Sequence, residues 1–425
     1  MNDSGSAGSG IERMGSGVWG RFFFVGLFLA ASGCGADEVE DDGATSVDSG
    51  FSQEDSSGVL ISVSDGSEAR EPIGWVVDTI PELILGDEDA PDEQFLGIAG
   101  LRGLPGGGAL VVDGISRELR FFDSTGRLSH RVGRKGEGPG EFDTPDLVPT
   151  LGTDSLLLWD RGLARFQEFS GDGQAHRTIR LTNRMPGGRS PPVGAVDHLM
   201  LVRRPELFTA EKFSRAGPIS VEVDFLWLDP LTGAETVLRA FTETIGYVAV
   251  TRGSSGPESI PFNWQAIGTV SETAALISEG RTSQIYEYGL DGDLRRIFRL
   301  AGPGRPVTEE IVEGALDLAT ADGRSRESWE EIFSRIPIPD TLPWFNSLQV
   351  DEEGWLWAEV YDWKPAQPVE WILFDPAGRA RGNIKTPPGL EVHRIGEDFV
   401  LGVWKDDLDV EYVKRYRLRR TLPGR

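Results

Sequence analysis

The sequence predicts an all-β fold built from consecutive four-stranded antiparallel sheets, and two observations predict it. A period of 47 residues runs without a gap through the first part of the chain, so that LGDEDAPDEQF at 85–95 aligns with VGRKGEGPGEF at 132–142. Each copy continues with four short apolar runs separated by turns that contain Gly. Repeats of about 40–50 residues with four strands each are typical of the blades of a propeller.

The two copies predict their strands in matching positions. The expected strands of the first copy are 97–104, 108–113, 117–123 and 127–132, and those of the second are 146–151, 155–160, 165–170 and 176–181. An aromatic residue followed four positions later by Gly recurs as Phe122/Gly126, Phe169/Gly173, Tyr288/Gly292 and Phe374/Gly378. The aromatic ring would fill the gap between neighbouring sheets, and the Gly would take the positive φ of a tight turn.

Four further units follow less regularly. They are expected near 190–241, 263–300, 345–385 and 390–420, with insertions in the third unit at 205–218 and 242–261. The last unit has only three strands, and the alternating segment 75–80 precedes the first repeat. We expect this segment to complete the last sheet, since closure removes exposed sheet edges. The prediction is a six-bladed β-propeller over 73–421, or seven blades if 242–262 forms strands of its own.

One segment departs from the strand pattern. Apolar residues recur at helical spacing over 308–318, and Ser328 with Glu331 has the spacing of a capping box before another short helical pattern. We expect a small helical insertion over about 306–336, between the fourth and fifth blades.

The first 34 residues predict export. Arg13 and Arg21 precede an apolar run at 22–31, which has the length of a signal-peptide core and about half the length of a membrane-spanning helix. Small residues then lead into Cys34, the sole cysteine, and this resembles a bacterial lipoprotein lipobox, with Ala31 where Leu is usual. The resemblance implies that 1–33 is a signal peptide, that Cys34 is lipidated and that the protein is anchored in the outer membrane. The alternative is an ordinary secretory signal with an unrelated cysteine.

The residues after the lipobox are expected to form a tether. The segment 35–72 has eleven acidic residues and few aromatic ones. Such a composition buries too little apolar surface to offset the loss of chain entropy. We therefore expect 34–72 to be an acidic disordered tether, with the propeller on either side of the outer membrane.

Composition excludes several partners. The net charge of −26 argues against nucleic acid, which carries dense negative charge itself. A single cysteine excludes an intrachain disulfide, and four histidines leave little for a histidine-rich metal centre. No Ser-His-Asp or Cys-His spacing indicates a nucleophile, and we expect no cofactor apart from the Ca²⁺ that an alternative below requires.

A candidate ligand site follows from strand parity. In a propeller, the loops between second and third strands lie on the same face as the connections between blades, which here include the helical insertion. All six of these loops contain Lys or Arg, which predicts a pocket for a carboxylate or sulfate, with Trp363 or Trp404 stacking on a sugar ring. The alternative is that these are ordinary turn charges whose ion pairs contribute under about 1 kcal/mol each. The candidate ligand-binding residues are Asp113, Arg117, Asp160, Arg161, Arg203, Glu279, Arg281, Trp363, Lys364 and Trp404.

Two stretches carry a family resemblance. FFDSTGRLSHRVGRKGEGPGEF at 121–142 and LQVDEEGWLW at 348–357 resemble a family of bacterial six-bladed β-propeller lipoproteins related to NHL-repeat and TolB-like propellers. The resemblance implies the fold and export, and it supplies no catalytic set.

Three hypotheses about function remain open. The first is a lipid-anchored envelope propeller that binds a small molecule, a glycan or a protein. The second is a Ca²⁺-dependent lactonase or hydrolase, similar to gluconolactonase-like propellers, in which Asp113, Asp160 and Glu279 supply oxygen ligands. The third is a scaffold similar to the propeller of the Tol–Pal system, with a peptidoglycan-associated partner.

Overall fold

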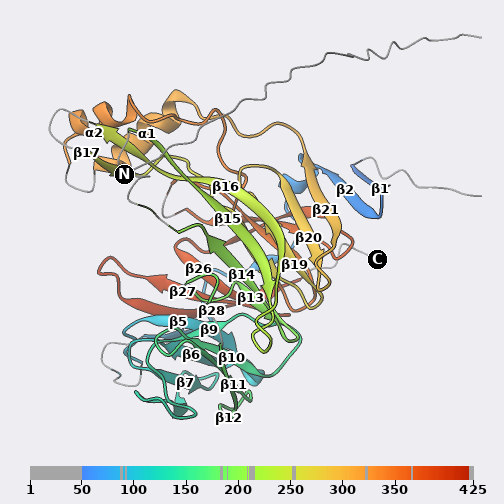
Figure 1. Ribbon diagram of the computed structural model, residues 1–425, viewed down its shortest axis with the longest axis vertical. Helices are drawn as coiled ribbons and strands as arrows, with labels where there is room; N and C mark the ends of the chain where they lie inside the picture. Colours follow the sequence, from blue (N-terminus) through green and yellow to red (C-terminus); the bar gives the residue numbers. More distant parts are fainter. Residues whose placement is uncertain are drawn as a thin grey trace, which may run out of the picture. The chain divides into compact units, whose positions relative to one another are not determined.

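A computed structural model describes residues 50–420, except for 87–89, 91–92, 182–184, 189, 208, 210–215, 251–254, 321–323 and 365–366. The predicted signal peptide, Cys34 and the first part of the predicted tether lie outside the described residues. The described strands form six sheets (Figure 1). The prediction of an all-β chain with repeated four-stranded antiparallel sheets is confirmed.

The two copies of the 47-residue repeat form the first two sheets. The first contains β5 (Ile98–Gly103), β6 (Ala109–Asp113), β7 (Glu118–Phe122) and β8 (Leu128–Val132). The second contains β9 (Pro145–Val148), β10 (Leu156–Asp160), β11 (Arg165–Phe169) and β12 (Ala175–Arg180). Each strand lies within one or two residues of its predicted position, apart from an earlier end of β9.

The third sheet has the longest strands. It contains β13 (Gly194–Val196), β14 (Leu199–Pro205), β15 (Gly217–Leu228), β16 (Glu235–Val250) and β17 (Ser255–Glu258). The expected insertion at 242–261 is the far end of β16 with β17 paired to it, so it adds to this sheet and forms no seventh one. In Figure 1 these far ends lie beside the two helices, and Arg324 next to the second helix pairs with Glu258 of β17 at 2.9 Å.

The fourth sheet gains two strands from the predicted tether. Its core is β18 (Ile267–Val270), β19 (Ala274–Ser278), β20 (Gln284–Gly289) and β21 (Leu294–Ala301). The hairpin of β1 (Phe51–Ser56) and β2 (Val59–Asp65) adds to it, with β2 parallel to β21. The expectation of disorder through residue 72 is therefore wrong from residue 51 onward. Its cause is that Ser62 and Ser64, which lowered the hydrophobicity of the segment, are buried.

The fifth and sixth sheets complete the series. The fifth contains β22 (Phe345–Val350), β23 (Leu356–Val360), β24 (Val369–Phe374) and β25 (Ala380–Thr386). The sixth contains β26 (Leu390–Ile395), β27 (Phe399–Lys405) and β28 (Glu411–Arg419), joined by β3 (Val76–Val77) and β4 (Leu83–Leu85). Both short strands pair antiparallel with β28, so the segment expected to complete the last sheet does so.

Apolar clusters join the sheets in a cyclic order. Each of six clusters of the described residues contains side chains from two sheets, and successive clusters join sheets one to two, two to three, and so on to five and six. The sixth cluster joins Leu401 and Val403 of the last sheet to Leu101 and Val111 of the first. Each sheet thus buries both of its faces, which a single four-stranded sheet cannot do alone.

The predicted helical insertion is present between the fourth and fifth sheets. It consists of α1 (Glu309–Ala319) and α2 (Arg326–Phe333). Thr308 caps α1 by accepting from the N–H of Ile311, and Ser325 caps α2 by accepting from the N–H of Ser328. The expected capping box was misplaced by three residues, since Ser328 lies inside α2. Neither helix is long and apolar enough to cross a membrane, and the same holds for every described helix.

Candidate functional site

The two aspartates that end equivalent strands are structural. Asp113 and Asp160 are fully buried. Asp113 accepts from the N–H groups of Leu96, Ile115 and Ser116 at 3.0–3.1 Å. Asp160 accepts from the N–H of Thr144 at 3.0 Å and lies 3.7 Å from the guanidinium of Arg165. These carboxylates therefore fix turns at the entry of their own sheets.

The predicted arginines at this end of the sheets also hold the backbone. Arg117 donates from Nε to the carbonyl of Asp143 at 2.7 Å, and Arg203 donates to the carbonyl of Ala266 at 3.2 Å. Arg203 also pairs with the buried Glu243 at 2.5 Å. In each case the arginine joins one sheet to the entry of the next. The expected ring of cations is thus mostly an intersheet device.

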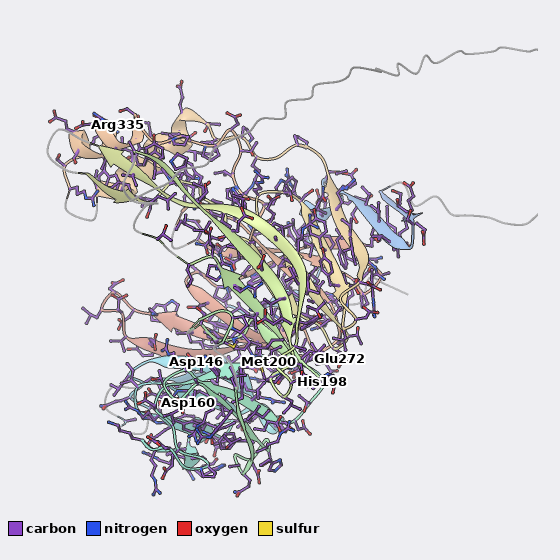
Figure 2. All side chains as sticks on the ribbon, in the orientation of Figure 1. Asp146, Asp160, His198, Met200, Glu272 and Arg335 are labelled. Atoms are coloured by element: carbon purple, nitrogen blue, oxygen red, sulfur yellow. The ribbon has the colours of Figure 1, made fainter. Side chains whose placement is uncertain are left out.

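Arg161 and Asp146 form a looser pair on the second sheet. Their charged atoms are 3.5 Å apart. Burial raises the pKa of Asp146, and Arg161 offsets part of that effect. Figure 2 labels Asp146 and Asp160, which come from adjacent strands of this sheet. The pair therefore belongs to the sheet rather than to a pocket shared with other blades.

The two tryptophans expected to stack on a sugar contact protein instead. Trp363 lies edge-on to Phe262 at 6.5 Å and packs against Gly314 of α1. The ammonium of Lys364 lies 5.0 Å from the Trp363 ring centre. Trp404 has the ammonium of Lys414 over its ring at 3.3 Å and Tyr412 at 5.7 Å. Trp363 therefore secures the helical insertion.

Glu279 and Arg281 are the predicted residues that lie beside a cavity. They pair at 2.8 Å, and the guanidinium of Arg281 lies 5.0 Å from the ring centre of Trp264. Trp264 lines a cavity of about 250 Å³ between the entries of the fourth and fifth sheets. The other lining residues are Asn263, Gln265, Ile267, Pro343, Phe345, Asn346 and Tyr361. We call this the Trp264 pocket.

Hydrogen bonds fix the polar walls of the Trp264 pocket. Asn263 donates to the carbonyl of Thr244 at 2.5 Å, and Asn346 donates to Glu359 at 2.8 Å. Arg305 donates to the carbonyls of Pro343 and Tyr361 at 2.9 and 2.6 Å, which ties two walls together. Burial is the main cause that lowers the pKa of Arg305 and raises that of Tyr361. Amides, a phenol and an indole therefore line the pocket in fixed positions.

Sequence reasoning missed Trp264 because its pocket has no local signature. The walls come from 263–267, 343–346 and residue 361, which lie up to 98 residues apart in the chain. The one local signal is NWQ at 263–265, a Trp between two amides just before a strand. The same face of the sheets was predicted to carry the site.

A second cavity of about 290 Å³ opens at the turns of the opposite end of the fourth and fifth sheets. Its lining includes Glu272, Glu287, Glu352, Glu353 and Asp375. Despite these carboxylates, no group of three or more His, Cys, Asp or Glu in the described part of the chain is arranged to hold a metal ion. Asp113 and Asp160 are engaged by their turns, and nothing brings them to Glu279.

Comparison with known proteins gives structural neighbours only. No family model matches the chain, and no curated protein matches it. A member of the duf4221 family from Bacteroides vulgatus aligns with a TM-score of 0.45 at 11% identity, covering 81% of this chain and 99% of that one. Virginiamycin B lyase from Staphylococcus aureus aligns at 0.35 and 10% identity, covering 82% and 100%. The calcium-binding protein regucalcin from Agrobacterium tumefaciens aligns at 0.31 and 10% identity, covering 82% and 95%.

Proposed function

We propose that the chain is a six-bladed β-propeller, anchored to the bacterial outer membrane through Cys34, that binds a glycan in the Trp264 pocket. Three features support the architecture: six sheets among the described residues, their cyclic packing and the pairing of β3 and β4 with β28. The lipobox resemblance supports the anchor.

The observation that carries the ligand class is the aromatic and amide lining of the pocket. Trp264 offers an apolar ring face, while Asn263, Gln265 and Asn346 provide amide groups that can donate and accept. A pyranose presents an apolar C–H face and a rim of hydroxyls, so it matches such a wall. The pocket of about 250 Å³ has room for about one sugar unit.

Arg281 would extend recognition to acidic sugars. Its side chain is 58% exposed, and it lies over the Trp264 ring with Glu279 beside it. A carboxylate or sulfate on the ligand would compete with Glu279 for the guanidinium, which binds such groups in a bidentate manner. We therefore propose that acidic glycans bind more tightly than neutral ones.

Titration of the full chain in detergent with neutral and uronic-acid oligosaccharides tests this function. We expect saturable binding that Trp264→Ala abolishes and that Arg281→Gln weakens for the acidic ligands alone. Trp329→Ala on α2 is the matched control, because Trp329 is also partly exposed and lies outside the pocket lining. Binding that survives Trp264→Ala, or no binding across the oligosaccharides, would overturn the proposal.

The anchor has a separate test. Replacement of Cys34 by Ala should move the protein from the membrane to the soluble fraction and end incorporation of labelled palmitate. If the Cys34→Ala variant still fractionates with the membrane, the anchor lies elsewhere.

A further inference from the structure

A small cavity between the inner strands of three sheets has a cationic wall. It measures about 60 Å³ and is lined by β5, by the end of β9 and by β26. Its polar lining residues are Arg102 on β5, Thr150 just before β10, and His393 and Arg394 on β26. Arg102 and Arg394 lie near the strand ends opposite to the Trp264 pocket. We call this the Arg102–Arg394 cavity.

Both guanidiniums hold the same turn of the second sheet. Arg102 donates to the carbonyls of Ser155, at 2.7 Å, and of Thr153. Arg394 donates to the carbonyl of Thr150 at 2.9 Å. These acceptors are neutral, so they orient the two guanidiniums without compensating their charge. A guanidinium has five N–H groups, and the printed bonds of each arginine use only part of that set.

The charge of the cavity wall is positive on a strongly acidic chain. The lining contains two arginines and no Asp or Glu. Glu352 pairs with Arg394 at 3.1 Å from outside the lining, so it offsets one of the two charges. Burial is the main cause that lowers the pKa of Arg102, and the nearby Arg394 lowers it further. Two like charges held together away from bulk water favour the binding of a counterion.

We propose that the Arg102–Arg394 cavity binds a small oxyanion of the phosphate class. Planar guanidiniums bind tetrahedral oxyanions through paired N–H···O bonds, and the hydroxyl of Thr150 can add a further donor. A volume of about 60 Å³ exceeds what one water needs and is too small for a sugar. The bound anion would join three sheets at the centre of the fold.

Calorimetric titration of the full chain with inorganic phosphate tests the proposal, at an ionic strength held constant with sodium chloride. We expect saturable binding of phosphate. Arg102→Gln and Arg394→Gln should each weaken it about tenfold or more, as the loss of a charge-assisted hydrogen bond does. Arg102→Lys, which keeps the charge and loses the planar fork, should weaken it less than Arg102→Gln.

Arg177→Gln is the matched control, because Arg177 also carries an ion pair, with Glu168 at 2.6 Å, on the exposed outer strand β12. It should leave the phosphate affinity unchanged. Absence of saturable heat in the wild-type protein would overturn the proposal, even if the two Gln variants failed to fold. Unchanged affinity in folded Arg102→Gln and Arg394→Gln would overturn it as well.

Discussion

The carboxylate of Asp160 accepts a hydrogen bond from the backbone N–H of Asp143 at 3.1 Å, and the same bond recurs 47 residues earlier between Asp113 and the N–H of Leu96 at 3.1 Å. A second bond repeats at the same period. Arg120 donates to the carbonyl of Gln94, and Gln167 donates to that of Glu141, both at 2.8 Å. The sequence period therefore records a repeated set of bonds that holds the chain at the entry of each sheet.

Removal of the Asp160 carboxylate should destabilise the protein strongly. Arg165 is 1% exposed and lies 3.7 Å from Asp160, so Asp160→Ala leaves a buried charge without its carboxylate partner. Loss of one partner of a buried pair costs about 3–5 kcal/mol. Guanidinium unfolding should give this loss in the free energy of unfolding, whereas Asp407→Ala in an exposed turn should change it little. Equal stability of the two variants would contradict the structural role.

The pairing of β4 with β28 can be tested with an engineered disulfide. Ile84 and Lys414 are direct antiparallel partners. Cα atoms of such partners lie about 4.5–5.5 Å apart, which suits a disulfide. In a Cys34→Ala background, Ile84→Cys with Lys414→Cys should cross-link on oxidation and raise the free energy of unfolding by about 2–4 kcal/mol.

The control for this cross-link pairs Ile84→Cys with Asp407→Cys, which the strand register does not bring together. That pair should stay reduced under the same oxidation. Failure of the Ile84–Lys414 pair to cross-link would show that the first and last sheets do not close on one another as described.

The fold was more predictable from sequence than the site. Strand positions and turns follow from local periodicity, and the pairing of 75–80 follows from a missing fourth strand. The roles of Asp113 and Asp160 depend on the direction of backbone N–H groups in a preceding connection, which residue types do not specify. The tether prediction failed because it averaged composition over a segment whose serines alternate with Leu60, Ile61 and Val63 in a buried hairpin strand.

The β1–β2 hairpin should stabilise the fifth sheet through Ser64. Its hydroxyl accepts from the N–H of Ala380 at 2.9 Å, and Ser64 is 2% exposed. Ser64→Ala leaves this buried donor without its acceptor, which costs about 1–3 kcal/mol. Hydrogen exchange should show faster exchange of the Ala380 amide, while Ser52→Ala on the exposed strand β1 should leave it unchanged. Unchanged protection of Ala380 in Ser64→Ala would mean that the hairpin is not docked there.

Stability should fall in mildly acidic solution because of His393. Burial lowers the pKa of His393 in the folded protein, and Glu391 and Glu411 offset part of that effect. The unfolded chain therefore takes up the proton first, so stability is lost as pH falls below about 6.5, the ordinary histidine value. His393→Gln should flatten the decline of the unfolding midpoint between pH 7 and 5.5, and His198→Gln in an exposed turn should not. A decline that is identical in wild type and His393→Gln would rule out this cause.

The docking of α1 should depend on the absence of a side chain at Gly314. A Cβ placed there would lie 2.2 Å from the nearest ring carbon of Trp363. Gly314→Ala should therefore displace the ring or the helix at a cost of about 1–3 kcal/mol, and it should increase hydrogen exchange in Glu309–Ala319 while β6 stays protected. Glu310→Ala, exposed on the same helix, is the control. Because Trp363→Ala removes the clash, the double variant should lose less stability than the two single losses added together. Strict additivity would mean that Gly314 and Trp363 do not touch.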